Sequence, residues 1–386
     1  MLYYLNSFRD IWGPLRLFEY QTFRAMMAGI TALVIGFIIA PRLIRFLNPF
    51  RQPELDAGTM GELAKTGGKI PTMGGAIILV PALLSAFLWL HFNVAVAVAL
   101  FVYLGMSTVG FIDDYVKVFR NNPNGISPKA KMAGLTLVAL LGIAVLLLES
   151  STRNQAIEIW VPFVKTAVLS ADTLPLWAGA AVAVVFFWLV TVSSSNAVNL
   201  TDGMDGLSVG CVITTLFCFG LIAYLSGHAV FASYLHISRV VGAGELTVLT
   251  AAILGGCMAF LWHNALPATI YMGDVGALGL GGVIGAIAFI TNQPFLLIII
   301  GGVFVAEAAS VIIQTSYYKR TKGLGKNGEG LRIFKMAPLH HHFRKEGVLS
   351  FLTSPDKRWA DSKIIIRFWM ISFLCGLIGL ATLKLR

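Results

Sequence analysis

The sequence predicts an all-α integral membrane protein, with about ten transmembrane helices in a single domain, residues 1–386. Hydrophobic residues make up 57% of the 386 residues and charged residues only 12%, and the mean hydropathy is +0.78. So few polar side chains cannot coat a water-soluble globule of this size. Since roughly 20 apolar residues span a bilayer, the chain has room for about ten spans and their loops. A soluble enzyme is therefore excluded.

Ten apolar windows define the expected spans. They lie near residues 23–46, 73–92, 94–111, 131–149, 174–194, 207–226, 245–262, 276–291, 294–318 and 363–383. The 39 glycines suit close helix packing. The four cysteines lie in apolar runs without a CxxC pair, so we expect core residues rather than disulfides or a thiolate metal site. No small-residue cleavage site follows a short apolar segment, so the first span is expected to be retained.

The distribution of lysine and arginine predicts that both termini face outward. With the N-terminus outside, the inner connections carry 20 of the 29 basic residues and the outer segments carry 8. Basic residues are retained on the cytoplasmic side of membrane proteins. The longest inner loop, residues 319–363, is also the most basic, with 11 lysines and arginines.

The net charge of +10 does not indicate a nucleic-acid partner. The basic residues punctuate apolar runs and form no patterned basic face of the kind that a nucleic-acid groove requires. Membrane topology and anionic ligands explain the charge better.

The first polar motif is FIDDY, residues 111–115, expected to end an apolar span at the cytoplasmic interface. The adjacent carboxylates of Asp113 and Asp114 repel each other and are tolerated where a cation or a basic side chain compensates them. Two interpretations remain open. The motif is either a solvated helix end whose acids pair with the lysines that follow, or a site that handles a divalent metal or protons at the membrane surface.

The second motif is NAVNLTDGMDG, residues 196–206, in an expected inner connection at 195–206 that has no basic residue. Its Asn199, Asp202 and Asp205 could form a simple turn. An inner loop rich in oxygen donors and free of lysine and arginine, however, suits a hard cation such as Mg²⁺, which leaves coordination positions for phosphate. We favour the functional interpretation.

The third motif is HNALPATIYMGD, residues 263–274, and it includes Asn264. Asp274 opens the next expected helix, where its carboxylate could simply cap free backbone N–H groups. Tyr271 offers a ring on which a base could stack, and the glycine after Met272 allows close approach of the backbone.

The fourth motif is MAPLHHHFRK, residues 336–345, within the basic loop. Consecutive histidines on a helix point about 100° apart, so His340, His341 and His342 are poorly arranged for a shared zinc. Imidazoles among basic residues instead suit an anionic phosphate group, and a solvated polar loop is the alternative. Glu307, in the ninth span, must face the bundle or a cavity. The glycines at 273–285 match no nucleotide-binding loop and predict close helix packing.

Taken together, these motifs and PTMGG at residues 71–75 resemble the phospho-N-acetylmuramoyl-pentapeptide-transferase family, from about residue 20 to the C-terminus. The wider superfamily of polyprenyl-phosphate N-acetylhexosamine-1-phosphate transferases shares the aspartate motifs, whereas the MAPxHHHF loop resembles the muramoyl-pentapeptide branch. The resemblance implies transfer of phospho-MurNAc-pentapeptide from UDP-MurNAc-pentapeptide to undecaprenyl phosphate with Mg²⁺, giving lipid I and UMP. It also implies a homodimer in the lipid bilayer of the bacterial inner membrane, acting in peptidoglycan synthesis.

The resemblance also implies roles for individual residues. Asp274 corresponds to the Mg²⁺ ligand, and Asp113 and Asp114 to the catalytic pair; His340 is placed with them. The implied substrate-binding residues are Thr72, Lys131, Asn199, Asp202, Asp205, Asn264, Tyr271, Gln314, His341 and His342. Of these, Tyr271 occupies the position that stacks on uracil.

The sequence departs from the family pattern at three places. Gly67 stands where the family has a lysine, and Lys65 and Lys69 flank it. The family's GDTGS reads GDVGA from residue 273, which loses two hydroxyl groups. The stretch TKGLGKNGEG, residues 321–330, is longer than its family counterpart.

Two mechanisms and two other functions remain open. The acceptor phosphate could attack in one step, or a phospho-aspartate could form in a double displacement. A sister-branch UDP-GlcNAc:polyprenyl-phosphate GlcNAc-1-phosphate transferase would share the aspartates. An ion-coupled transporter would explain membrane carboxylates, but its sites usually lie near the bilayer midplane rather than at one face.

Overall fold

The computed structural model describes residues 1–48, 70–120, 122–170, 173–325, 328–346, 350–352 and 358–385. Within these ranges the chain is mainly helical, and an isolated bridge pairs Ile159 with Leu169. The elements are η1 Leu2–Phe8, η2 Gly13–Glu19, α1 Gln21–Leu47, α4 Gly75–Trp89, α5 Val94–Phe119, α6 Pro128–Leu148, α7 Ser150–Ile157, α8 Leu176–Thr201, α9 Leu207–Gly227, α10 Ala229–Leu235, α11 Gly244–Asn264, α12 Gly273–Ile290, α13 Pro294–Ile300, α14 Gly302–Arg320, α15 Leu339–Arg344 and α16 Asp361–Thr382. The predicted all-α class is confirmed.

Eight of the described helices are long and apolar enough to cross a membrane. The bent pair α13 and α14 makes a ninth if it is counted as one span, and α4 is a shorter apolar helix of 15 residues. Each of the ten expected spans therefore overlaps a helix or the bent pair. The chain is a multi-pass membrane protein, and the count of ten stays a prediction.

Two local predictions are wrong, and one predicted window is interrupted. The window at 294–318 is occupied by α13 and α14, which meet at Gly301 with a bend of 85°. The expected inner connection at 195–206 is mostly helical, because α8 continues to Thr201. Helix α5 does not end at the FIDDY motif but runs on to Phe119. In the latter two cases polar residues continue a helix that hydropathy alone terminates.

Helix α12 is the central helix, and all its residues from Asp274 to Ile290 are buried. Glycines let its neighbours approach closely. A Cβ on Gly75 of α4 would collide with the backbone of Gly276, and one on Gly281 would lie 2.6 Å from the Cα of Ser195 in α8. The expected packing role of the 273–285 glycines is confirmed. The four cysteines are free, and three of them are buried.

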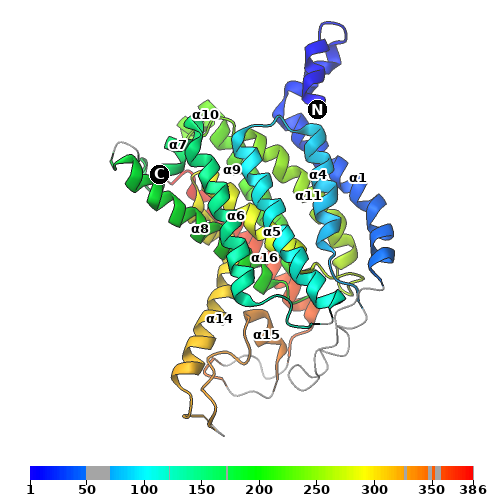
Figure 1. Ribbon diagram of the computed structural model, residues 1–386, viewed down its shortest axis with the longest axis vertical. Helices are drawn as coiled ribbons and strands as arrows, with labels where there is room; N and C mark the ends of the chain where they lie inside the picture. Colours follow the sequence, from blue (N-terminus) through cyan, green and yellow to red (C-terminus); the bar gives the residue numbers. More distant parts are fainter. Residues whose placement is uncertain are drawn as a thin grey trace.

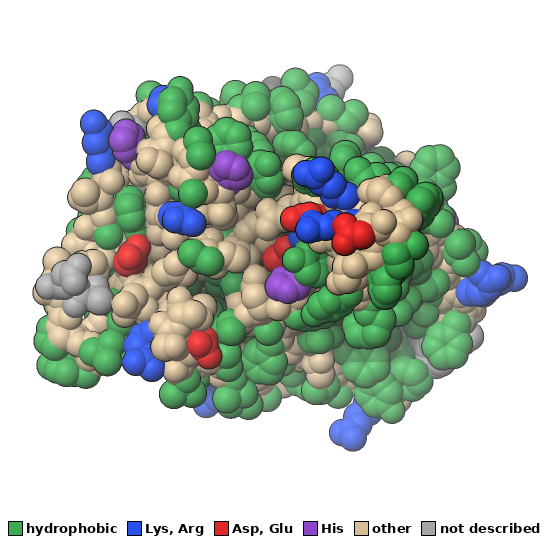
Figure 2. Space-filling view, turned by 90° about the horizontal axis from the view of Figure 1, so that it is seen from above, with side chains coloured by type: hydrophobic (Ala, Val, Ile, Leu, Met, Phe, Trp, Pro, Cys, Tyr) green, Lys and Arg blue, Asp and Glu red, His purple; other side chains and the backbone are tan. Residues whose placement is uncertain are grey.

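Both termini lie at one end of the helix bundle, and α15 lies at the other (Figure 1). The N-terminal amino group donates hydrogen bonds to the carbonyls of Phe87 and Leu88, at the C-terminal end of α4. Gly74 and Gly75, at the other end of α4, bond to the segment that opens α12. On the terminal end, hydrophobic side chains predominate and charges are scattered, apart from one mixed group (Figure 2). The assignment of this end to the outside stays a prediction.

Candidate active site

Three buried carboxylates meet at the end of the bundle that lies away from the termini. Asp113 and Asp114 belong to α5, and Asp274 is the second residue of α12. Their exposed fractions are 2%, 0% and 8%, and one oxygen of each lies within 4.8 Å of the other two. We call these residues the acidic triad. Carboxylate oxygens at this spacing suit a divalent cation.

Two lysines neutralise part of the charge of the acidic triad. The Lys117 ammonium lies 2.6 Å from Asp113 Oδ2 and 2.9 Å from Asp274 Oδ2. The Lys131 ammonium, from the first turn of α6, lies 2.7 Å from the same Asp274 oxygen. The predicted pairing of acids with lysines is therefore present, but at a buried site rather than at a solvated helix end.

One oxygen of the triad is free for a further ligand. Asp114 Oδ1 is buried and makes no hydrogen bond to any described residue; its nearest basic atom is the Lys117 nitrogen, 4.0 Å away. A buried carboxylate oxygen without a partner is costly. The donor set therefore fits a divalent cation, which would satisfy this oxygen.

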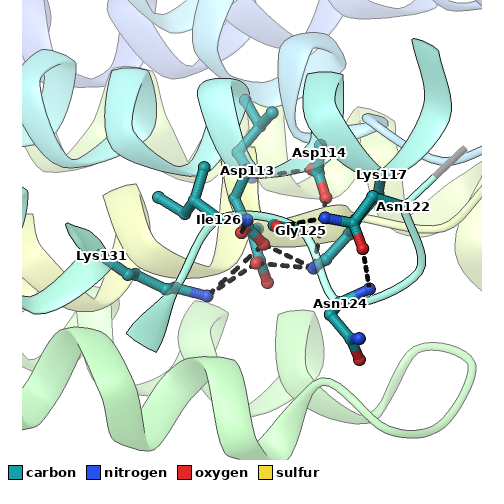
Figure 3. A network of polar contacts seen from close by, with 10 residues as sticks. Asp113, Asp114, Lys117, Asn122, Asn124, Gly125, Ile126 and Lys131 are labelled. Carbon is teal, nitrogen blue, oxygen red and sulfur yellow. Dashed lines mark hydrogen bonds and ion pairs between the residues drawn. The ribbon is translucent and has the colours of Figure 1, made fainter. Parts of the chain in front are cut away.

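Backbone amides orient one oxygen of Asp113 and one of Asp114. Ile126 N–H donates to Asp113 Oδ1 at 2.9 Å, and Val275 N–H, at the start of α12, donates to Asp114 Oδ2 at 3.2 Å. Gly125 approaches the Asp113 carboxylate with φ +65°, and a Cβ there would collide with it. Figure 3 shows Asp113, Asp114, Lys117 and Lys131 converging, with the turn that carries Gly125 and Ile126 beside them.

The PTMGG segment lines the same site. Gly74 N–H donates to the Tyr271 carbonyl at 2.8 Å, and Tyr271 N–H donates to the Pro71 carbonyl at 2.9 Å. These bonds hold the segment against the chain that enters α12. Thr72 is 1% exposed, and its hydroxyl has no hydrogen-bond partner among the described residues. Lys65, Gly67 and Lys69 lie outside the described residues.

We expect Gly273→Ala to impair the site. Gly273 has φ +72°, and a Cβ there would collide with Asp114 Oδ2 and lie 2.9 Å from Thr72 Oγ1. The conformation alone costs an alanine about 1–2 kcal/mol; the clash adds to this and displaces the triad. Gly328→Ala is the matched control, with φ +76° and nothing within 4 Å. Mn²⁺ binding at the site, followed by electron paramagnetic resonance, should weaken in Gly273→Ala only, and equal losses would contradict this explanation.

The connection between α8 and α9 adds two more acids. Asn199 lies in the last turn of α8, half-buried, and Asp202 follows the helix directly. Burial raises the pKa of Asp202 to about 8, and the negative charges of Asp274, Asp114 and Asp205 contribute. Asp202 is thus within electrostatic reach of the acidic triad. Its carboxyl largely retains a proton at neutral pH when no cation is bound.

Asp205 and Asn264 connect this turn to the chain leading into α12. Asp205 Oδ2 accepts from the backbone N–H of Ala268 at 3.0 Å. The Asn264 amide accepts from Gly206 N–H at 2.9 Å and donates to the Ile270 carbonyl at 2.9 Å. Both side chains therefore brace the site, and the substrate contacts expected of them stay predictions.

Tyr271 lies at the edge of the site and is half-buried. Burial raises the pKa of its hydroxyl, the charge of Asp205 adds to this, and the charge of Arg344 opposes it. The hydroxyl is therefore within electrostatic reach of Asp205 and of Arg344 in the histidine loop, residues 336–345. Base stacking on this ring stays a prediction.

The three histidines occupy the short helix α15. His340 is fully buried, with its ring against Gly203, so the histidine loop contacts the turn that holds Asp202. The rings of His340 and His341 lie 4.1 Å apart between centroids. The loop thus belongs to the same end of the molecule as the acidic triad.

Gln314 and His342 hold the loop through their side chains. Gln314 Oε1 accepts from the backbone N–H groups of Ile333 at 3.1 Å and Phe334 at 2.9 Å. His342 Nδ1 accepts from Lys335 N–H at 3.0 Å. These bonds give both residues a structural part, and their expected substrate contacts stay predictions.

We expect His341 to make the protein acid-sensitive. The pKa of His341 is lowered to about 3, chiefly because burial disfavours the imidazolium; the charges of His340, Arg344 and Lys345 add to this. In an unfolded chain, histidine binds its proton near pH 6.5. The unfolded state therefore binds more protons between these values, so the stabilisation is complete above about pH 6.5 and is lost as the pH falls toward 3.

The measurement is the thermal midpoint in detergent between about pH 7 and pH 5. In His341→Asn the thermal midpoint should fall less as the pH is lowered. His228 is an exposed histidine near the opposite end of the molecule, and His228→Asn should show the same fall as the unmodified protein. A decline in His341→Asn as steep as in the unmodified protein would contradict the assignment.

Lys117 was not among the site residues predicted from the sequence, although the signal was available. On a helix, residues four apart lie on one face, and Lys117 stands four residues after Asp113 and three after Asp114. The sequence pattern indicated only that Lys117 is one of the lysines that could neutralise the two acids. The structure places its ammonium inside the acidic triad.

The fold and site define a class: a multi-pass membrane protein with a buried cluster of acids and lysines at one end of its helices, whose carboxylates suit a divalent cation. Known sequences give the family. The model of glycosyl transferase family 4 matches residues 96–292.

Phospho-N-acetylmuramoyl-pentapeptide-transferases match the chain over essentially its full length. The one from Opitutus terrae is 44% identical and covers 100% of both chains. The one from Maridesulfovibrio salexigens is 42% identical over 97% of this chain and 96% of its own. The one from Rickettsia felis is 43% identical over 96% and 95%. This chain belongs to the phospho-N-acetylmuramoyl-pentapeptide-transferase family, as the motifs predicted.

Proposed function

We propose that this protein transfers phospho-MurNAc-pentapeptide from UDP-MurNAc-pentapeptide to undecaprenyl phosphate, forming lipid I and UMP. The observation that carries the proposal is the acidic triad with its two lysines, in a chain that matches transferases of this name over its whole length. Both substrates are strongly anionic and one is a lipid. A membrane protein that has buried lysines and a cluster of carboxylates suited to a cation, at one end of its helix bundle, suits both substrates.

The cofactor we propose is Mg²⁺, held by Asp274 with Asp113 and Asp114 beside it. When bound, it supplies positive charge that stabilises a pyrophosphate and its leaving UMP. The lysines supply further charge from the protein itself. Lys117 and Lys131 already contact Asp274, and a phosphoryl group entering the cluster would exchange their carboxylate partners for phosphate oxygens.

We favour direct attack over a phospho-aspartate intermediate. A phosphate monoester has its second pKa near 6, so much of the acceptor is already a dianion at neutral pH. An oxygen of this acceptor attacks the phosphorus that carries the sugar, and the bond from that phosphorus to the oxygen of UMP breaks. Asp113 or Asp114 orients the acceptor and takes any residual proton. Inversion at phosphorus would support one step, and retention would support two.

Placement in the cell follows from the same proposal. The chain is a single transmembrane domain of the bacterial cytoplasmic membrane with both termini outside, and the loop at 319–363 faces the cytoplasm. It acts as a homodimer. The remaining substrate contacts are those of Thr72, Lys131, Asn199, Asp202, Asp205, Asn264, Tyr271, Gln314, His341 and His342, with His340 beside the reacting groups.

The test is UMP release by purified protein in detergent from UDP-MurNAc-pentapeptide, with and without undecaprenyl phosphate and Mg²⁺. Release that requires both additions supports the proposal. Release from UDP-GlcNAc but not from the muramoyl donor would assign the protein to the sister branch. Inactivity with both donors in a folded sample would favour the ion-coupled transporter.

A further inference from the structure

A buried carboxylate outside the acidic triad contacts the histidine loop. Glu307 lies on α14, with none of its surface exposed. Its Oε1 accepts from the backbone N–H of His340 at 3.1 Å and lies 3.2 Å from His340 Nδ1. An unpaired carboxylate at this depth would be costly. Glu307 is therefore committed to His340.

The backbone bond replaces a missing helix cap. Helix α15 begins after Pro338, which provides no capping side chain. The first N–H groups of a helix have no acceptor within the helix. A capping side chain normally accepts a hydrogen bond from the N–H of the second helical residue. That group belongs to His340, and Glu307 accepts from it across the fold. The carboxylate also favours the positive end of the helix.

The ring of His340 also contacts the turn that holds Asp202, which is a residue of the proposed substrate site. The other edge of the His340 ring lies against Gly203, where a Cβ would stand only 2.8 Å from His340 Cε1. Gly203 follows Asp202 directly. The Nδ1 edge of the ring lies beside the same carboxylate, and neither ring nitrogen makes a hydrogen bond to any described residue. One carboxylate thus caps the start of α15 and lies beside the ring of its first histidine.

We infer that Glu307 is a positioning residue: through His340 it holds the histidine loop against the Asp202 turn, in the place where the loop contacts the donor substrate. The inference rests on the proposed transferase function for its kinetic consequence, but not for its structural one. Glu307 itself does not touch substrate.

The kinetic test compares Glu307→Ala, Glu307→Gln and His340→Ala, with Glu245→Gln as control. Glu245 is also a buried, paired carboxylate, 2.5 Å from Arg24, but it opens α11, about 30 Å from the end of that helix near the site. Glu307→Ala should lower kcat/KM for UDP-MurNAc-pentapeptide about 10- to 100-fold, as for a lost charged hydrogen bond. Glu307→Gln, which retains an acceptor oxygen, should lose less, and Glu245→Gln should leave KM for the donor unchanged.

Two further results decide whether Glu307 acts through His340. Glu307→Ala should cost less in the His340→Ala background than in the unmodified protein, because only the bond to the backbone N–H of residue 340 is left there to lose. Without any assay of activity, trypsin should cleave after Arg344 or Lys345 faster in Glu307→Ala than in Glu245→Gln.

Additive losses in the double variant, or trypsin cleavage at equal rates in both carboxylate variants, would overturn the inference. An unmodified protein that releases no UMP would refute the proposed function instead, and the trypsin comparison would still decide the role of Glu307.

Discussion

Asp274→Asn is expected to abolish both catalysis and cation binding. Asp274 contacts both lysines of the site and completes the triad whose oxygens lie within 4.8 Å. The neutral amide removes a charge from the cation site and leaves two ammonium groups with fewer partners. Because one preorganised charged group is worth about 10²- to 10³-fold in rate, we expect UMP release to fall by at least that factor.

Binding of Mn²⁺, followed by electron paramagnetic resonance, separates this explanation from simple unfolding. Glu245→Gln serves as the control, since it also neutralises a buried carboxylate paired with a basic residue. It should bind Mn²⁺ as the unmodified protein does. Normal Mn²⁺ affinity in a folded Asp274→Asn sample would refute the assignment of the acidic triad as the metal site.

Lys117→Gln is expected to separate cation binding from catalysis. The Lys117 ammonium touches Asp113 and Asp274 and lies 4.0 Å from Asp114. Its removal leaves the triad more negative, so Mn²⁺ should bind more tightly. UMP release should nevertheless fall about 100-fold, because the phosphoryl group loses a positive charge that the protein holds in place.

The matched control for this variant is Lys129→Gln. Lys129 is exposed and lies two residues before Lys131 at the start of α6, so the change removes the same charge outside the triad. It should alter neither Mn²⁺ binding nor UMP release. Weaker Mn²⁺ binding in Lys117→Gln would mean that the lysine supports the cation site rather than competing with the cation for it.

The class of protein and the acids that meet in the candidate site were readable from the sequence. Hydropathy is a property of each segment, so spans such as 23–46 and 207–226 were located close to α1 and α9. The acids of the FIDDY motif and Asp274 stood out because charged groups are rare beside apolar spans.

Other features of the site depended on contacts between distant segments. The 85° bend between α13 and α14 left no clear mark in the hydropathy, because the apolar run continues through Gly301. Asn264 and Gln314 were expected to bind substrate, yet their amides bond to backbone groups in the chain leading into α12 and in the histidine loop. Residues that bind substrate and residues that brace a site are of the same polar types, so the sequence alone does not distinguish them.

By itself the sequence determined that this is an all-α membrane protein of a known transferase family, with its acids close to apolar spans and three consecutive histidines in the longest basic loop. Only the tertiary structure decided that Lys117 lies among three carboxylates and that Glu307 bonds to His340, 33 residues away. The physical reason is that hydrophobic burial is set segment by segment, whereas the partner of a buried charge is set by which helices pack together.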